Sequence, residues 1–224
     1  MYSGKIFLEI LKGISQNKSL CRVLQNFEAK KHSISGNIIE FGAEPKSTKN
    51  FSSLMHNKTV KNFYFSDKYL SKKGIIKADL NKKINIKKKF FDNVILFNVL
   101  EHIFDVKNAK SQISKITKRN GYLIGSTPFL YRFHKAPSDY LRFTKPFIIR
   151  LFKKEYKIKN VKNLGFGPFC LCYSMLSDFT KKIPILNYIL FIISFLLDLF
   201  LDMLVKYDLK DIYPIAIFFK LKKK

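Results

Sequence analysis

One stretch decides the fold of this chain: Phe90-Phe-Asp-Asn-Val-Ile-Leu-Phe-Asn-Val-Leu-Glu-His-Ile103. Its central run, Val94 to Phe97, is continuously apolar and rich in β-favouring residues, which is typical of a strand covered on both faces in a parallel sheet. The polar residues Asn98, Glu101 and His102 follow where this strand ends. Open α/β sheets bind their ligands at the carboxyl ends of their strands, so these residues are candidates for a binding or catalytic site.

The chain around this stretch alternates between patterns typical of strands and of helices. Strands are predicted at 37–41, 61–66, 74–78, 92–98, 121–126, 156–163 and 213–219. A turn and first helix are predicted over 42–55, a second helix over 106–117, and a third over 146–154, capped by Thr144. Asn120-Gly121 is a turn signal. The alternation predicts an α/β fold with a mostly parallel, doubly wound seven-stranded sheet and helices on both faces.

Both ends of the chain are predicted to be helical. Residues 1–30 form an N-terminal helical cap, residues 31–165 the core, and residues 166–224 a C-terminal helical extension with the last strand. The extension contains a long helical region that breaks or restarts at Pro184. Asp198, Asp202 and Lys206 follow one another at four-residue spacing, which predicts a salt-bridge stripe on one helix face.

The apolar segment 189–205 has three interpretations. A membrane span is the least favoured, because a span needs about 20 apolar residues without such charges. Buried packing or a dimer contact is the second. The third is a helix lying on a membrane surface, aided by the lysines around it.

The chain is strongly basic, with 42 Lys and Arg against 16 Asp and Glu and a formal net charge of +26. Such a field attracts nucleic acid or anionic lipid, although a codon bias toward lysine explains it equally well. Only five of the basic residues are arginine, the residue expected for bidentate reading of bases and phosphates. Nucleic acid is therefore disfavoured as a partner, and a peripheral membrane contact is ranked above it.

Cysteine usage and the first residues bear on the compartment. Cys21, Cys170 and Cys172 make no disulfide framework, and a single Cys-x-Cys is a poor metal signature, so no metal site is predicted. Glu9 interrupts the first apolar run, so no secretory signal is expected. These features predict a cytoplasmic protein, located at the inner face of the membrane if the extension contacts lipid. They do not predict an oligomeric state.

Two motifs support a family resemblance over residues 37–154. The first is Phe91-Asp-Asn-Val-Ile-Leu-Phe-Asn-Val-Leu-Glu-His-Ile-Phe-Asp105, with the helix after it and Asn-Gly-Tyr-Leu-Ile. The second is Pro128-Phe followed by His134-x-x-Pro137-x-Asp139-Tyr140-x-Arg142-Phe143-Thr144. Together they resemble class I S-adenosylmethionine-dependent methyltransferases, in particular small bacterial methyltransferase-domain proteins of surface-polysaccharide gene clusters. The resemblance implies a Rossmann-like methyltransferase fold and S-adenosylmethionine as cofactor.

The resemblance also implies which residues bind the cofactor. Those residues are Glu40, Gly42, Ala43, Asp67, Asp79, Leu80, Asn98 and Glu101. The turn at Gly42 would lie beside the methionine part, and Asp67 would accept hydrogen bonds from the ribose hydroxyls. Asp79 and Leu80 would line the adenine pocket. Asp67 and Asp79 also have a plain alternative as turn-forming residues.

The turn after the first strand departs from the family pattern. The family usually has a glycine-rich run there, whereas this chain reads Gly42-Ala-Glu-Pro-Lys-Ser47, with one glycine. Glu44 and Pro45 reduce flexibility and remove a backbone donor near the expected cofactor carboxylate. Lys46 is a candidate partner for that carboxylate.

Methyl transfer to a hydroxyl requires an in-line geometry and removal of a proton. The catalytic candidates are His134, oriented by Asp139, and then His102. Arg132, Tyr140 and Arg142 are the candidate acceptor-binding residues. Three alternatives stay open: Asp139 and Arg142 form an internal ion pair, His102 is a packed residue, or Glu101 caps a helix or pairs with a lysine.

The predicted function is O-methylation of a sugar in a surface glycan or its lipid-linked precursor, with a small-molecule or glycan acceptor. The alternative is a non-catalytic, methyltransferase-like scaffold associated with membrane glycan assembly. A nucleic-acid methyltransferase is a third and less favoured interpretation.

Overall fold

The structure is a computed structural model and describes residues 4–45, 47, 49–70, 72–134 and 138–224. The chain forms two compact units, each assembled from segments far apart in the sequence. The sheet unit comprises Ala29–Thr127, His134–Lys162 and Phe218–Lys224. The helical unit comprises Met1–Glu28, Pro128–Phe133 and Asn163–Ile217.

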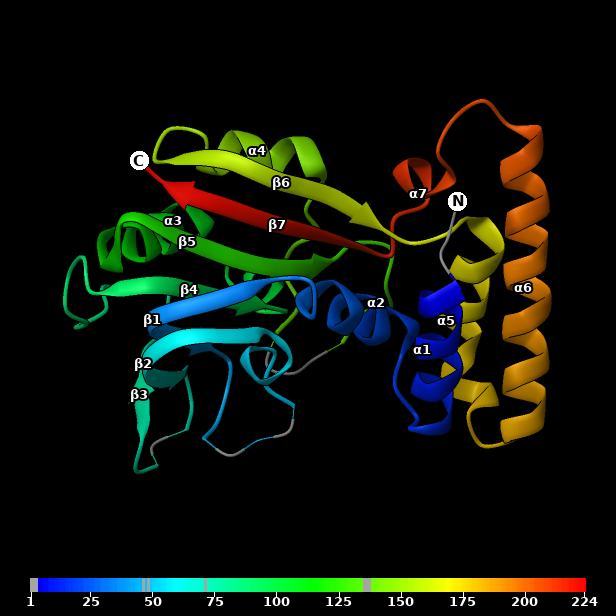
Figure 1. The fold of residues 1–224 in the computed structure, drawn as a ribbon, viewed down its shortest axis with the longest axis horizontal. Coiled ribbons are helices and arrows are strands. Elements are labelled where there is room, and N and C mark those ends of the chain that lie inside the picture. The colour runs from blue at the N-terminus through cyan, green and yellow to red at the C-terminus, as the bar shows by residue number, and fades with distance from the viewer. Residues whose placement is uncertain (1–3, 46, 48, 71, 135–137) are drawn as a thin grey trace. The chain divides into compact units, whose positions relative to one another are not determined.

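Seven strands form one sheet in the order β3-β2-β1-β4-β5-β7-β6 (Figure 1). Their bounds are β1 Ser33–Phe41, β2 His56–Asp67, β3 Ile75–Lys77, β4 Phe91–Phe97, β5 Thr117–Pro128, β6 Tyr156–Leu164 and β7 Ala216–Lys223. β1 pairs in parallel with β2 and β4, and the β2–β3 and β4–β5 pairs are parallel too. The arrow of β7 points against those of β5 and β6 in Figure 1. The predicted mostly parallel, seven-stranded α/β fold is confirmed.

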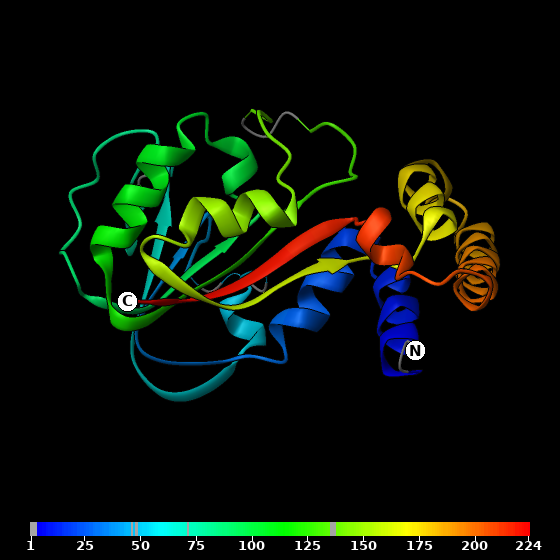
Figure 2. The same ribbon diagram turned by 90° about the horizontal axis from the view of Figure 1, so that it is seen from above.

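β4 is the buried strand predicted from the sequence, because Val94, Ile95 and Leu96 are all fully buried. Helices α3 (Val106–Ile116) and α4 (Lys145–Phe152) lie on one face of the sheet (Figure 2). The predicted cap of α4 is present, since the Thr144 hydroxyl accepts a hydrogen bond from the Phe147 amide. The segment that follows the carboxyl end of β4 is a short 3₁₀ turn, η2 (Leu100–His102).

The predicted helix within 42–55 is wrong, because the described residues of this segment form a single 3₁₀ turn, η1 (Ser52–Leu54), and no longer helix. The buried carboxylate of Glu40 accepts hydrogen bonds from the amides of Phe51 (2.7 Å) and Ser52 (3.0 Å). Amides that start a helical turn lack partners inside it, so this carboxylate stabilises the turn. The sequence contains no periodic apolar face that would extend it into a helix.

The predicted turn at Asn120-Gly121 is also wrong, since both residues lie inside β5. The pairing register between β4 and β5 shifts there, and Asn120 has a φ of 65°. The pair therefore forms a β-bulge within one strand. The last strand, β7, begins at Ala216 and not at the predicted residue 213, after the short helix α7 (Leu209–Ile212), and it extends to Lys223.

Asp92, the first polar residue of the opening stretch, has a structural role at the start of β4. Its carboxylate accepts a hydrogen bond from the Asn37 amide on β1 (2.8 Å) and contacts Lys118 Nζ on β5 (2.9 Å). Gly36 has a φ of +72°, and a Cβ there would lie 2.3 Å from the Asp92 carboxylate. Asp92 thus joins three strands at the sheet edge opposite the polar cluster.

The helical unit contains α1 (Gly4–Ser15), α2 (Leu20–Ala29, whose last residue belongs to the sheet unit), α5 (Pro168–Thr180) and α6 (Pro184–Leu204). α5 and α6 lie side by side in both views (Figures 1 and 2). Phe7 of α1 packs on Phe191 and Phe195 of α6, with ring centroids 5.7 and 5.1 Å apart. α6 starts at Pro184, as predicted, and is long and apolar enough to cross a membrane by length and composition alone.

The predicted salt-bridge stripe on α6 is wrong. Asp198 is only 1% exposed, and its two oxygens accept hydrogen bonds from the amides of Phe169 (3.0 Å) and Cys170 (2.8 Å). α6 ends at Leu204, so Lys206 lies beyond the helix. Asp198 therefore caps the first turn of α5 from a neighbouring helix, and its charge is absent from the exposed face of α6.

We expect Asp198→Asn to destabilise the protein by about 1–3 kcal/mol, because an amide has one acceptor oxygen and leaves one α5 amide facing an NH₂ group. The free energy of unfolding, measured by urea denaturation with circular dichroism, tests this. Asp202→Asn on the same helix is the matched control and should change stability by no more than about 0.5 kcal/mol. Equal effects of the two substitutions would contradict the capping role.

Candidate active site

A pocket in the sheet unit opens at the carboxyl ends of β1, β2, β3 and β4. Its lining residues are Phe41, Gly42, Ser66, Asp67, Lys68, Tyr69, Ala78, Asp79, Leu80, Asn81, Asn98, Val99, His102 and Ile103. β1 lies between β2 and β4, so the strand order reverses at this point. Ligands bind at such switch points in open α/β sheets. We call this the cofactor pocket; it contains five of the eight predicted cofactor residues.

The turn after β1 requires glycine at position 42. Gly42 has a φ of +69°, and its amide donates a hydrogen bond to the Ser66 carbonyl (2.7 Å). A Cβ there would lie 3.2 Å from the Val99 side chain. The backbone therefore closes the pocket floor without a side chain. Lys46, the candidate partner of the cofactor carboxylate, lies outside the described residues.

Two acids at strand ends line the pocket and also shape the turns after them. Asp67 Oδ1 accepts hydrogen bonds from the amides of Tyr69 (2.7 Å) and Leu70 (3.0 Å). Asp79 Oδ1 accepts from the amide (2.9 Å) and side chain (3.1 Å) of Asn81. Burial opposes ionisation of Asp79, but the Asn81 hydrogen bonds and the Lys68 charge outweigh it and lower its pKa. The turn-forming role and the pocket-lining role are thus both present.

Three predicted cofactor residues, Glu40, Ala43 and Glu101, are not among the described residues that line the pocket. The Glu40 carboxylate is directed to the η1 amides instead. Ala43 is buried at 4% exposure. Glu40 therefore supports the turn behind the pocket, and a direct cofactor contact by Glu40, Ala43 or Glu101 stays a prediction.

Glu101 lies in η2 (Leu100–His102), immediately after β4, and its side chain is fully buried. Its Oε2 accepts a hydrogen bond from the Thr127 hydroxyl (3.2 Å), whereas no described residue hydrogen-bonds to Oε1. Burial raises the pKa of this carboxyl to about 8. The helix cap considered for Glu101 is supplied by Asp105, whose side chain accepts from the Asn108 amide.

His102 lines the cofactor pocket beside this carboxyl group. Its Nδ1 lies 2.6 Å from the Ser138 carbonyl, and its Nε2 lies 3.8 Å from Glu101 Oε1. Burial lowers the pKa of His102. Its ring meets that of His134 edge to face, with centroids 5.0 Å apart. His102 is therefore held in place by the loop after β5 and also faces the pocket.

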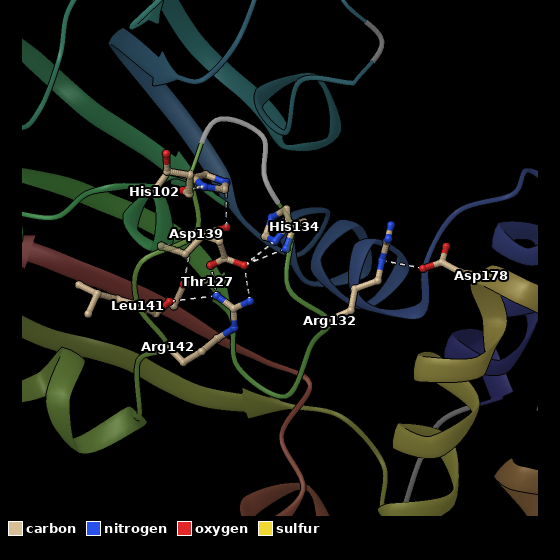
Figure 3. Close-up of polar contacts among 10 residues, drawn as sticks. His102, Thr127, Arg132, His134, Asp139, Leu141, Arg142 and Asp178 are labelled. Carbon is tan, nitrogen blue, oxygen red and sulfur yellow. Dashed lines mark hydrogen bonds and ion pairs between the residues drawn. The ribbon is translucent and has the colours of Figure 1, made fainter.

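The loop after β5 brings His134, Asp139 and Arg142 together (Figure 3). His134 Nδ1 lies 2.9 Å from Asp139 Oδ2, which also accepts from the His134 amide (3.1 Å). The Arg142 guanidinium binds both oxygens of Asp139 and holds the pKa of that carboxyl well below its usual range. Both predicted arrangements are present: Asp139 orients His134, and it forms an ion pair with Arg142.

The structure assigns other contacts to the predicted acceptor-binding residues. Both terminal nitrogens of Arg142 bind the Asp139 carboxylate, so they do not also form a bidentate contact with an acceptor. Arg132 belongs to the helical unit and pairs with Asp178 of α5 (Nε to Oδ2, 2.6 Å; Figure 3). The Tyr140 amide donates to the Glu101 carbonyl (2.8 Å), and its half-exposed ring packs edge to face on Phe104.

Several residues that organise the site were not predicted. Asn81 donates to Asp79 and accepts hydrogen bonds from the amides of Phe104 (2.9 Å) and Asp105 (3.1 Å). Asn81 therefore joins the end of β3 to the start of α3. An Asn two residues after a strand-end Asp is a turn signal that could have indicated it. Nothing in the local sequence marks Thr127 as the partner of Glu101.

Comparison with known proteins gives the family. A family model described as a methyltransferase domain matches residues 14–158, well over half of the 224-residue chain. No curated protein sequence matches the chain.

Solved structures share the fold at low identity. A protein assigned as an S-adenosylmethionine-dependent methyltransferase from Listeria monocytogenes superimposes with a TM-score of 0.52 at 12% identity, covering 91% of this chain and 98% of that one. Haemonchus contortus phosphoethanolamine N-methyltransferase 2, solved with phosphomonomethylethanolamine and S-adenosylhomocysteine, gives 0.53 at 13%, covering 88% and 52%. The [4+2]-cyclase SpnF gives 0.51 at 8%, covering 88% and 79%. At these identities the likeness establishes the fold alone.

The family match and the strand order agree with each other and with the residues at the strand ends. The predicted fold class and the predicted enzyme class are confirmed. The chain belongs to the methyltransferase-domain family and has the Rossmann-like fold of S-adenosylmethionine-dependent methyltransferases.

Proposed function

We propose that the protein transfers a methyl group from S-adenosylmethionine to a hydroxyl of a sugar in a lipid-linked precursor of a surface glycan. One observation supports this most: the paired rings of His102 and His134 adjoin the cofactor pocket, and His102 lines it. A hydroxyl loses its proton as it is methylated, so such an enzyme needs groups that manage that proton.

S-adenosylmethionine is the methyl donor. In the pocket, Asp67 would accept hydrogen bonds from the ribose hydroxyls and Leu80 would pack on the adenine. The Gly42 turn would hold the methionine part, because the missing Cβ allows close approach. The acceptor oxygen then attacks the methyl carbon in line with the sulfur, and the carbon–sulfur bond breaks as the carbon–oxygen bond forms.

An exposed aromatic pair supports a sugar as the acceptor. Phe104 is 75% exposed and Tyr140 51% exposed, and their ring centroids are 5.7 Å apart. Both residues lie close to Glu101 and His102. Phe104 follows His102 by two residues, and the Tyr140 amide donates a hydrogen bond to the Glu101 carbonyl. Exposed rings offer an apolar surface on which the C–H face of a sugar ring can pack.

The helical unit supports a membrane as the site of this reaction. Large apolar side chains of α5 and α6 are exposed, including Leu176, Phe179, Ile185, Ile189, Ile193, Leu196, Phe200 and Met203. We call these residues the apolar face. Asp198 is turned inward, so it adds no charge there, whereas the exposed Lys181, Lys182 and Lys206 lie just outside the ends of α6.

This combination fits an anionic bilayer surface. Apolar side chains enter the boundary between headgroups and acyl chains, and lysines at the rim pair with anionic headgroups. α1 covers part of α6, which favours a helix lying in the interface over a helix that crosses the bilayer. The protein then acts at the inner face of the membrane, where a lipid-linked glycan is within reach.

Cofactor binding is tested by adding S-adenosylhomocysteine to the purified protein. We expect a rise in melting temperature that grows with ligand concentration. Asp67→Asn keeps one side-chain oxygen to accept the Tyr69 and Leu70 amides and replaces the other by an NH₂ group. It should raise the Kd for S-adenosylhomocysteine about 10-fold. Asp202→Asn is the control and should bind like wild type. No shift at millimolar ligand, with wild type and Asp67→Asn alike, would favour the non-catalytic scaffold instead.

Membrane binding is tested by sedimentation with vesicles. Wild type should bind vesicles rich in phosphatidylglycerol and bind neutral phosphatidylcholine vesicles more weakly. The double substitution Ile193→Glu with Phe200→Glu should weaken binding at least 10-fold, because both side chains would lose favourable burial. Ile193→Leu with Phe200→Leu keeps the apolar area and should bind normally. A concentration-dependent dimer without vesicle binding would assign the apolar face to a second copy of the chain.

A further inference from the structure

We infer that Glu101, His102 and His134 together bind a divalent metal ion at the wall of the cofactor pocket. Each residue offers one ligand atom, and these atoms all lie within 4.8 Å of one another. No metal site was predicted from the sequence, because that prediction rested on the poor metal signature of the cysteines. Glu101 and His102 lie more than thirty residues before His134 in the chain. They meet because the carboxyl ends of the neighbouring strands β4 and β5 adjoin.

Glu101 gives the first reason for a cation. Its side chain is fully buried, and Oε1 has no hydrogen-bond partner among the described residues. A buried polar oxygen without a partner is costly, and a carboxylate more so. The 3.8 Å from Oε1 to His102 Nε2 is too long for a direct hydrogen bond. Two ligands of one ion are roughly 3.0–3.4 Å apart when each bond is about 2.1 Å, so a small movement brings both atoms onto a shared metal.

The hydrogen bonds of the histidines give the second reason. A carbonyl oxygen can only accept, so the Ser138 carbonyl, 2.6 Å away, places the proton of His102 on Nδ1. The Asp139 carboxylate does the same for His134 Nδ1 at 2.9 Å. In both rings this directs Nε2 to act as the metal-binding nitrogen. Metal-binding histidines usually donate their other ring N–H to a carbonyl or carboxylate in this way.

The chemistry of the site follows from the donor set. Two imidazoles and one carboxylate suit Zn²⁺, Mn²⁺, Co²⁺ or Fe²⁺ and leave coordination positions open. His102 also lines the cofactor pocket, so the open positions adjoin the place where the methyl acceptor must bind.

The metal would deepen the proposed function, on which this step rests. An acceptor hydroxyl bound to the ion becomes more acidic and releases its proton to water. The oxygen then attacks the methyl carbon, the carbon–sulfur bond breaks, and its electron pair stays on sulfur to give neutral S-adenosylhomocysteine. His102 and His134 promote the loss of this proton by holding the ion that acidifies the hydroxyl, and they do not act as bases themselves.

Metal binding is tested without cofactor or acceptor. The protein is treated with a chelator, dialysed, and titrated with Co²⁺ and with Zn²⁺, following visible absorption for Co²⁺ and heat for both. We expect one ion per chain. His134→Ala and Glu101→Gln should each weaken binding at least 100-fold. His56→Ala removes an exposed histidine outside the cluster and should bind like wild type.

Folding of the variants is tested separately. Glu101→Gln replaces a buried acid with a neutral group of the same shape, so the metal-free variant should melt no lower than metal-free wild type. Zn²⁺ should raise the melting temperature of wild type and not that of Glu101→Gln. No stoichiometric binding by wild type, or equal loss in His56→Ala and His134→Ala, would overturn the metal site.

The two proposals fail separately. Methyl transfer that persists in chelated protein without a bound ion would overturn the metal site and leave the methyltransferase function intact. A bound ion with no response to S-adenosylhomocysteine would support the metal site and count against the proposed function.

Discussion

The complete burial of Glu101 is the constraint on which the rest of the site depends. Its main-chain carbonyl accepts hydrogen bonds from the amides of Tyr140 (2.8 Å) and Leu141 (3.3 Å). Its side chain accepts from Thr127 at the end of β5. One residue shortly after β4 therefore contacts both ends of the loop that carries His134. His102 adds a third contact through the Ser138 carbonyl, and such contacts offset the entropy lost when a long loop is ordered.

A comparison of Glu101 with two of the other buried carboxylates, Glu40 and Asp198, shows how costly its burial is. Glu40 and Asp198 each accept two backbone amides at the start of a helical turn, so both oxygens of each side chain have partners. Such pairs stabilise the fold because the amides also lack partners inside the helix. Glu101 has one neutral hydroxyl and one oxygen without a hydrogen bond. Glu40 and Asp198 therefore have a structural role. Glu101 instead keeps an oxygen that could still bind a proton or an ion, and this oxygen lies beside the proposed reaction site.

The sequence predicts the fold because buried parallel strands have continuous apolar runs and end in polar residues, as β4 does at Asn98. It predicts Asp67 and Asp79 at the pocket for the same reason. It mispredicts Asp198, since helical spacing shows which residues share a face but not whether solvent or another helix covers that face. It also cannot show that Thr127 is the hydrogen-bond partner of Glu101 or that Arg132 pairs with Asp178. Pairings across a folded loop depend on where the backbone turns, which no local pattern encodes.

The charge of the proposed metal site affects cofactor binding at the turn after Gly42, which lacks the glycine-rich run of the family. An ion of charge +2 held by one carboxylate and two neutral imidazoles leaves the site at +1, which repels the sulfonium of S-adenosylmethionine. An ionised acceptor oxygen on the metal cancels that charge. Pro45 offers no backbone N–H in the turn after Gly42, so the cofactor would be bound most favourably when the acceptor is in place. Such coupling is reciprocal, so cofactor and acceptor strengthen each other's binding. The enzyme would then hold its reactive sulfonium tightly only when an oxygen is positioned to accept the methyl group.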